Sequence, residues 1–149
     1  MKMTGEVRIE APPEAVWARL LDLASAPDYV PYLTAAEPAS AEPVKVGSTA
    51  DLTFQGGGLQ ATGTAAVTGL EPPRRLALEV AVPQFHLAMD VTVTVSAAGA
   101  TSQVSELVEV RFSTPFMKAM GEGLLRLRDP EAHLRQGLLQ LKRSVEGQA

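Results

Sequence analysis

Two long segments of alternating apolar and polar residues constrain the fold of this chain more than any other feature. From His86 to Ser96 every odd position is apolar, and most even positions carry His, Asp, Thr or Ser. The segment Thr101–Phe112 continues the alternation, and Ala97–Ala100 provides a short turn between the two. A period of two is typical of a β-strand that buries one face. The sequence therefore predicts an antiparallel hairpin with one apolar face.

Shorter segments with the same alternation extend this hairpin into a larger sheet. A glycine run at 56–58 supplies a hairpin turn. Pro83 ends the predicted strand that directly precedes it in the sequence, Arg75–Val82. An edge strand with its connecting loop is expected within 35–46, because proline cannot donate a hydrogen bond to a central ladder. The further predicted strands are Met3–Glu10, Thr49–Gln55, Leu59–Thr68 and Arg75–Val82.

Helical patterns occur at two places in the chain. Ala11–Glu14 has proline and an acidic residue where a first helical turn favours them, and one more helical turn is expected within Ser25–Leu33. After Thr114–Pro115 the apolar period changes from two to 3.6, which predicts one long helix or two collinear ones. Asp129–Glu131 resembles a cap followed by a first-turn proline, so a kink or restart is expected there. The apolar stripe consists of Phe116, Met120, Leu124, Leu127, Leu134, Leu138, Leu141 and Val145.

Length and charge exclude several classes of protein. The 149 residues fit one domain, 1–149, since no linker or repeat divides them. The net charge of −4 would repel a phosphate backbone, so no nucleic-acid partner is expected. The absence of cysteine makes the cytoplasm the expected compartment. No apolar run is long enough for a signal peptide or a membrane span, so any membrane role is expected to be peripheral.

Residue types limit the chemistry further. The chain has no cysteine, so disulfides, a thiolate nucleophile and thiolate metal ligands are excluded. The two histidines, His86 and His133, stand in no metal-binding spacing, and no metal or cofactor is expected. The glycine run lacks the lysine of a phosphate-binding loop, and no serine lies in a nucleophile motif.

Three local motifs resemble the START-like or Bet v 1-like superfamily, which includes the polyketide cyclase/dehydrase group. Gly5–Trp17 is similar to its first strand and helix start, Tyr29–Leu33 to its short second helix, and Leu70–Leu76 to its turn before the fifth strand. The resemblance implies an α+β helix-grip fold, in which a curved antiparallel sheet of six or seven strands surrounds a long C-terminal helix. The implied order is β-α-α-β-β-β-β-β-β-α. The stretch Met1–Trp17 also resembles the small proteins of this superfamily that accompany carbon monoxide dehydrogenase, which carry lipophilic ligands or assist membrane attachment.

A helix-grip fold implies a cavity where the curved sheet and the helix diverge. Its lining is expected from the inward sheet positions and from the helix stripe, although each residue taken singly is more simply explained by core packing. Tyr29, Tyr32 and Phe116 are expected at the cavity mouth, since rings with mixed polarity suit an entrance. The expected lining is Leu78, Val80, Met89, Val91, Val104, Glu106, Val108, Val110, Met120, Leu124 and Leu127.

Glu106 is the candidate residue for chemistry. It lies between Val104 and Val108 on the apolar face, where a carboxylate loses solvation unless it is paired, protonated or wetted by a cavity. It is therefore a candidate polar anchor or a general acid/base with a raised pKa. A β-bulge that turns it to solvent, or neutralisation by Arg126, remains an alternative.

Three functions are compatible with these features. The first is a non-catalytic carrier of a small hydrophobic ligand such as a lipid, isoprenoid or polyketide. The second is a cyclase/dehydratase-type enzyme in which Glu106 moves protons, and the third is an accessory protein that contacts a redox complex or a membrane. The sequence favours the first, because it indicates an apolar pocket without a catalytic constellation. A membrane contact would use the basic helix residues Lys118, Arg126, Arg128, Arg135, Lys142 and Arg143.

Overall fold

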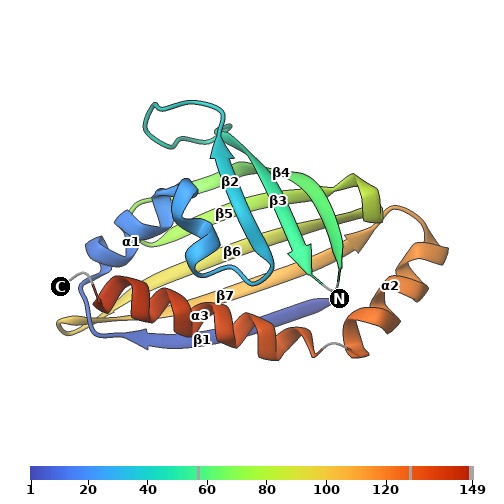
Figure 1. Cartoon of the computed structure of the whole chain (residues 1–149). Helices are drawn as coiled ribbons and strands as arrows, with labels where there is room; N and C mark the ends of the chain where they lie inside the picture. Colours follow the sequence, from blue (N-terminus) through green and yellow to red (C-terminus); the bar gives the residue numbers. More distant parts are fainter. Residues whose placement is uncertain (57, 128, 148–149) are drawn as a thin grey trace.

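The chain folds into one curved antiparallel sheet that holds helices against its concave face (Figure 1). The computed structural model describes residues 1–56, 58–127 and 129–147, with the side chains of 124–127 left aside. The seven strands lie in the order β1-β7-β6-β5-β4-β3-β2, so that β1 and β2 form the two edges. The strands are β1 (Lys2–Ile9), β2 (Leu33–Pro38), β3 (Thr49–Gly56), β4 (Leu59–Glu71), β5 (Arg75–Val82), β6 (Leu87–Ala98) and β7 (Thr101–Phe112).

The two segments with the clearest alternation form neighbouring strands of the sheet, as predicted. β6 and β7 pair in an unbroken register from Leu87 with Phe112 to Ala98 with Thr101. Their inward side chains become more buried toward the turn, where Val95 and Val104 are fully enclosed. The opposite face carries charged pairs, including Arg111 with Asp90 at 3.0 Å. The period of two thus separates an apolar concave face from a polar convex one.

Helices cover part of the concave face. α1 (Pro13–Leu21) and the short 3₁₀ helix η1 (Leu23–Asp28) follow β1, and α3 (Pro130–Glu146) runs along β1. Figure 1 shows α2 (Pro115–Leu127) leaving the sheet at an angle to α3. None of the helices in the described ranges is long and apolar enough to cross a membrane.

The predicted restart at Asp129–Glu131 is confirmed, but α2 and α3 are not collinear (Figure 1). Asp129 adopts a left-handed backbone with φ of 47°, which turns the chain between the helices. Its side chain accepts a hydrogen bond from the Ala132 amide and so caps α3. The apolar stripe that runs from Phe116 to Val145 in the sequence is therefore divided between two helices, α2 and α3, that present separate surfaces.

The edge strand begins earlier than predicted. β2 starts at Leu33 and ends at Pro38, and the chain then loops to β3. The sequence places Leu33 in the second helical turn, but that turn is the 3₁₀ segment η1 and ends at Asp28. Pro38 is tolerated in this edge strand, and the ladder continues past it, since the Ala39 amide donates to the Thr49 carbonyl oxygen at 3.0 Å.

The buried apolar residues form three clusters along the concave face. One cluster joins α1 and α3 to the part of the sheet near the β6–β7 turn, and its central residues include Ile9, Val104 and Leu141. A second lies beneath β2 and β3, and a third, with Met3, Val108 and Val110, lies at the start of β1. The core is therefore divided between separate regions of one sheet face.

Candidate functional site

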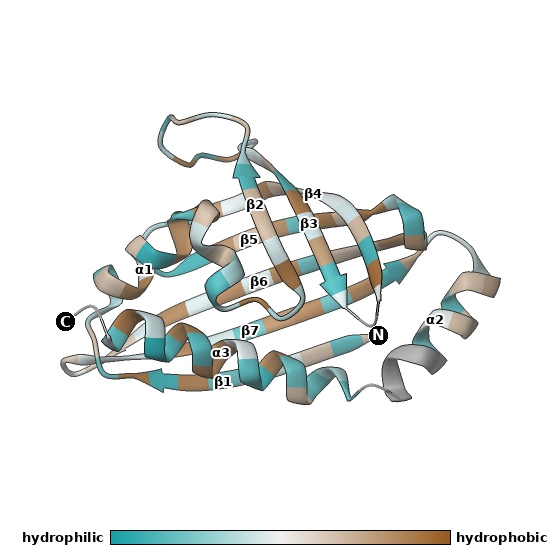
Figure 2. Ribbon diagram, viewed as in Figure 1, coloured by the Kyte–Doolittle hydropathy of each residue, from teal (hydrophilic) through white to brown (hydrophobic). Residues whose placement is uncertain are grey.

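The three clusters meet on β6 at side chains that are not fully buried. Leu87 and Met89 pack against both the second and the third cluster, and Val91 packs against all three. Each of them keeps accessible surface, unlike Val93 and Val95 further along the same strand. Figure 2 shows that the neighbouring strands also carry apolar residues. The centre of the concave face is thus apolar and incompletely covered.

The sheet residues that were predicted to line a cavity all lie on this face. Val80, Val104, Val108 and Val110 are buried within the clusters, and Leu78, Met89 and Val91 are partly exposed. A ligand on this face would therefore contact Leu78, Met89 and Val91 most directly, because these side chains are partly exposed.

The α2 residues that were predicted to line the cavity or its mouth are more exposed than these sheet residues. Met120 is 47% exposed and Phe116 is 70% exposed, because the face of α2 that carries them points away from the sheet. α2 approaches β7 at Gly121, where a Cβ atom would collide with the ring of Phe112. The side chains of Leu124 and Leu127 lie outside the described residues. Met120 therefore does not form a buried wall, and Phe116 stands exposed at the end of the concave face.

Glu106 points inward from β7, as expected from its alternation with Val104 and Val108. The strand pairs without a bulge on both sides of it, with Gly5 on β1 and Val93 on β6. Burial raises the pKa of Glu106 to about 7, because the charged form is poorly solvated there. No hydrogen bond to its carboxyl group occurs among the described residues, and the side chain of Arg126 lies outside them.

Gly5, the residue paired with Glu106 on β1, lets α3 pack closely against the sheet. A Cβ atom at Gly5 would lie 3.0 Å from Leu138 of α3, so the helix rests directly on the β1 backbone. Glu106 is almost enclosed by protein, yet it keeps some accessible surface. Glu106 is therefore nearly but not completely shielded from solvent.

Tyr29 lies close enough to Glu106 for their charges to interact. Burial raises the pKa of the Tyr29 phenol, and the negative charge of Glu106 raises it further. The residue packs against the first cluster, and its carbonyl oxygen would lie 2.8 Å from a Cβ atom placed on Gly137. This glycine allows α3 to approach the segment that positions Tyr29. Tyr29 thus packs between the first cluster and α3, and its predicted place at a cavity mouth stays a prediction.

Tyr32 forms a contact between three elements at the rim. Its ring lies over Gly56 at the end of β3, where a Cβ atom would approach it to 2.7 Å. Its hydroxyl group lies 2.8 Å from Nε2 of His133 on α3. Nδ1 of His133 is 3.1 Å from the Asp129 carbonyl oxygen, which can only accept, so in the neutral ring Nε2 accepts the tyrosine proton. The residue is 48% exposed and adopts a left-handed backbone with φ of 68°.

His133 is the site residue that the sequence does not identify. In the sequence His133 lies beside the apolar stripe of the helix, and this position indicates no function. The contact spans 101 residues, and no local pattern connects His133 with Tyr32.

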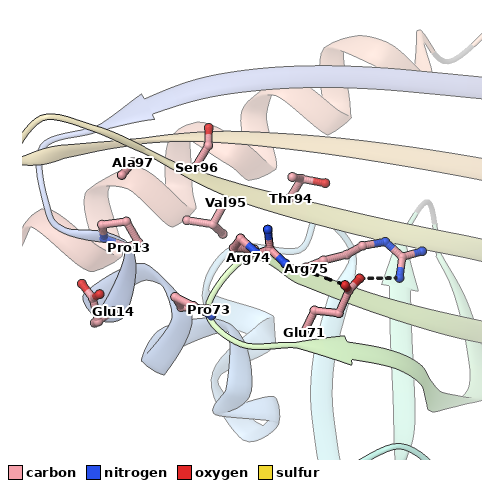
Figure 3. Close-up of a pocket in the computed structure, with 10 residues that line it drawn as sticks. All are labelled: Pro13, Glu14, Glu71, Pro73, Arg74, Arg75, Thr94, Val95, Ser96 and Ala97. Atoms are coloured by element: carbon pink, nitrogen blue, oxygen red, sulfur yellow. Dashed lines mark hydrogen bonds and ion pairs between the residues drawn. The ribbon is translucent and has the colours of Figure 1, made fainter.

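Two surface hollows lie outside the centre of the concave face. One, of about 560 Å³, is bounded by the β4–β5 turn, the start of α1 and the end of β6 (Figure 3). Its arginines, Arg74 and Arg75, both pair with Glu71. The other, of about 630 Å³, lies between Met1–Met3 and the start of α3. The paired charges in the first hollow offer no reactive group, so the concave face remains the candidate site.

No group of three or more potential metal ligands occurs in the described parts of the chain. The site instead consists of apolar side chains, one nearly enclosed carboxyl group and a buried phenol. Such a combination can hold an apolar molecule and provide one or two hydrogen bonds to it.

Comparisons with known proteins agree with the geometry. Residues 1–146 match the family model described as polyketide cyclase / dehydrase and lipid transport. A comparison with curated proteins gives no match. Among solved structures, a Thermus thermophilus protein has a TM-score of 0.80 at 14% identity, covering 100% of this chain and 99% of its own. A Deinococcus radiodurans protein has a TM-score of 0.71 at 19% identity, with 100% of both chains covered.

A plant protein has the same fold. Ginseng major latex-like protein 151 from Panax ginseng has a TM-score of 0.59 at 17% identity, covering 89% of this chain and 96% of its own. The seven-stranded curved sheet with its C-terminal helix confirms the predicted helix-grip architecture. The chain therefore belongs to the polyketide cyclase/dehydrase and lipid transport family.

Proposed function

We propose that this protein binds a small hydrophobic molecule between the concave face of the sheet and α3. The observation that carries the proposal is the set of partly exposed apolar side chains, Leu87, Met89 and Val91, where the three core clusters meet. Leaving such side chains accessible forgoes about 25 cal/mol for each Å² of apolar surface that remains in water. A ligand that covers them would recover this free energy.

The ligand class follows from the chemistry of the walls. Valine, leucine and methionine side chains offer dispersion contacts without directional preference, which suits a lipid, an isoprenoid or a polyketide-like molecule. The family to which the chain belongs includes lipid transport, which supports the same class. Selectivity within that class would come from the few polar groups on the face.

The test combines detection of a bound molecule with a blocked variant. Native mass spectrometry of the purified protein is expected to show a co-purified lipophile, and addition of a fatty acid or quinone is expected to raise the melting temperature. In Val91→Trp the indole ring would occupy the centre of the face and abolish binding. Thr92→Trp places the same ring on the opposite face of β6 and serves as the control.

The proposal fails if the protein is consistently empty and no lipophile shifts its melting temperature. It also fails if Val91→Trp and Thr92→Trp bind a lipophile equally well.

A second candidate function is proton transfer by Glu106 in a cyclase/dehydratase-type reaction. The observation that favours it is the pKa of about 7, since a general acid/base works best with a pKa near the operating pH. Glu106→Gln keeps the shape of the side chain and removes the titrating proton. Turnover of a polyketide-like substrate is expected to fall by about 10²–10⁴-fold in this variant. Unchanged turnover would exclude the catalytic role and leave the binding role intact.

A further inference from the structure

We propose that Tyr32 and His133 form a clasp across the opening of the concave face, and that a hydrophobic ligand enters and leaves when this clasp opens. The inference rests on the binding function proposed above and concerns how the same site exchanges its ligand. The clasp consists of these two side chains, with the backbone of Gly56 beneath the Tyr32 ring.

The two residues lie next to the walls that flank the proposed ligand position. Leu33, which follows Tyr32, is buried in the cluster beneath β2 and β3. Leu134, which follows His133, packs against the cluster at the start of β1. The partly exposed β6 side chains that carry the binding proposal pack against both of these clusters. A contact between Tyr32 and His133 therefore spans the gap between the two walls.

The segment that leads to Tyr32 is packed tightly against α3 at its other end. A Cβ atom on Gly137 would lie 2.8 Å from the Tyr29 carbonyl oxygen and 3.1 Å from Cδ of Pro31. His133 precedes Gly137 by about one helical turn, so both residues face this segment. Figure 1 shows the segment, between η1 and β2, beside α3. The backbone is thus fixed at Gly137, whereas side chains hold the end at Tyr32.

The contact between the two side chains is of a kind that opens and closes easily. The Tyr32 hydroxyl group lies 2.8 Å from Nε2 of His133, and the two ring centroids are 5.2 Å apart with a tilt of 46°. Nearly half of the Tyr32 side chain is exposed, and exposed side chains change rotamer within nanoseconds. The Gln55 amide donates to the Tyr32 carbonyl oxygen at 2.8 Å, so the ring can swing while the backbone stays on β3.

Gly56 makes room for the closed position of the ring. A Cβ atom on Gly56 would lie 2.7 Å from Cδ1 of Tyr32, which is closer than two carbon atoms can approach. The φ of Gly56 lies outside the left-handed range, so its backbone conformation does not require glycine. The close approach of the ring does require it. A side chain at this position would therefore displace Tyr32 from His133.

The test measures the rates at which the full-length protein binds and releases N-phenylnaphthylamine, an uncharged apolar fluorophore. Association is followed by stopped-flow mixing, and release by transfer to an excess of phosphatidylcholine vesicles. Tyr32→Phe and His133→Phe each keep a ring and remove the hydrogen bond. Each is expected to raise both rate constants by about 2–10-fold, the value of one hydrogen bond. Kd is expected to stay unchanged, because the clasp closes over the empty and the occupied site alike.

Two further variants test whether the side chains act as one contact. The double variant Tyr32→Phe with His133→Phe is expected to exchange the fluorophore no faster than the faster single variant. Gly56→Ala alters neither partner of the hydrogen bond, yet it is expected to accelerate both rates because it displaces the Tyr32 ring. Gly123→Ala is the matched control, since its Cβ atom meets nothing within 4 Å, and native rates are expected.

A covalent bridge tests the closed form directly. The chain has no cysteine, so Tyr32→Cys with His133→Cys introduces the two thiols that a bis-methanethiosulfonate reagent can join. The bridged protein is expected to lose rapid association and rapid release, and reduction of the bridge is expected to restore both. The same variant treated with methyl methanethiosulfonate carries two unlinked adducts and serves as the control.

The outcomes separate the clasp from the binding function. Native rates in Tyr32→Phe and His133→Phe overturn the clasp while hydrophobic binding stands. Faster release with unchanged association also overturns it, because the side chains would then contact the bound ligand. A native protein that does not bind the fluorophore overturns the binding function and the clasp with it. Circular dichroism and thermal melting verify the folding of each variant, and Tyr32→Phe, the smallest change, keeps the test valid if Gly56→Ala does not fold.

Discussion

Replacing Glu106 by glutamine is expected to change how the stability of the protein depends on pH. The pKa of this carboxyl group is about 7 in the folded protein and 4.5 in its unperturbed state. The folded state therefore binds more protons than the unfolded state between these pH values, and stability falls as pH rises through this window. At 1.36 kcal/mol for each pH unit, the total loss is about 3 kcal/mol, most of it between pH 5 and 8.

The amide of Glu106→Gln does not titrate, so the variant does not share this loss. Relative to the native protein, it is expected to gain about 2.5 kcal/mol of stability on going from pH 5 to pH 8, a relative shift in melting temperature of roughly 5–10 °C. Urea unfolding and thermal melting of both proteins at several pH values measure the difference. Comparison of the two proteins removes the contribution of all other titrating groups.

Glu109→Gln provides the control for this experiment, because the side chain of Glu109 is exposed on the other face of β7. Its stability curve is expected to follow that of the native protein. The reasoning would be refuted by parallel curves for the native protein and Glu106→Gln between pH 5 and 8. Parallel curves would mean that the carboxyl group is solvated in the folded state.

Further substitutions test the packing around the site. Gly137→Ala is expected to destabilise the protein by about 1–3 kcal/mol in urea unfolding, because its Cβ atom would press on the Tyr29 carbonyl oxygen at 2.8 Å. Gly123→Ala, on the open side of α2, meets nothing within 4 Å and is expected to stabilise by about 0.5–1 kcal/mol instead. Tyr32→Phe removes the hydrogen bond to α3 and is expected to speed ligand release in stopped-flow displacement; an unchanged release rate would exclude a role for the rim contact in ligand exchange. Ser102→Ala removes a fully buried hydrogen bond of 2.7 Å to the Ala11 carbonyl oxygen, and a cost of about 1–3 kcal/mol is expected from thermal or urea unfolding.

The sheet could be predicted from the sequence because period two is a local signal that each strand carries by itself. The bounds of β5 and β7 are those predicted, and the inward orientation of Glu106 follows from its spacing to Val104 and Val108. The alternation also identifies the charged convex face, since Asp90 and Arg111 fall on the opposite set of positions. These features depend on the backbone period and require no knowledge of the tertiary structure.

The direction of α2 and the rim contact could not be predicted in this way. The apolar stripe continues from Phe116 to Val145, so the pattern alone does not show that the chain turns between the two helices. The turn depends on the left-handed backbone of Asp129, and the pairing of Tyr32 with His133 depends on where two distant segments are brought by the fold. The predicted range for edge strand β2 begins too late, because the sequence pattern assigns Leu33 to the preceding helical turn, whereas that turn ends at Asp28 and leaves Leu33 free to pair with β3.

The position of β1 in the sheet has a consequence for the order in which the protein is made. β1 is translated before the other strands, yet in the described sheet its neighbour is β7, and Lys2 pairs with Glu109. At 5–20 residues per second, roughly 5–20 s pass before the ribosome has made the partner of this strand. The pairing of β1 with β7, which completes the sheet beneath α3, therefore forms last. Pairings of such large sequence separation fold slowly. A nascent chain stopped before β7 would present β1 as an unpaired amphipathic strand, the kind of segment that chaperones bind.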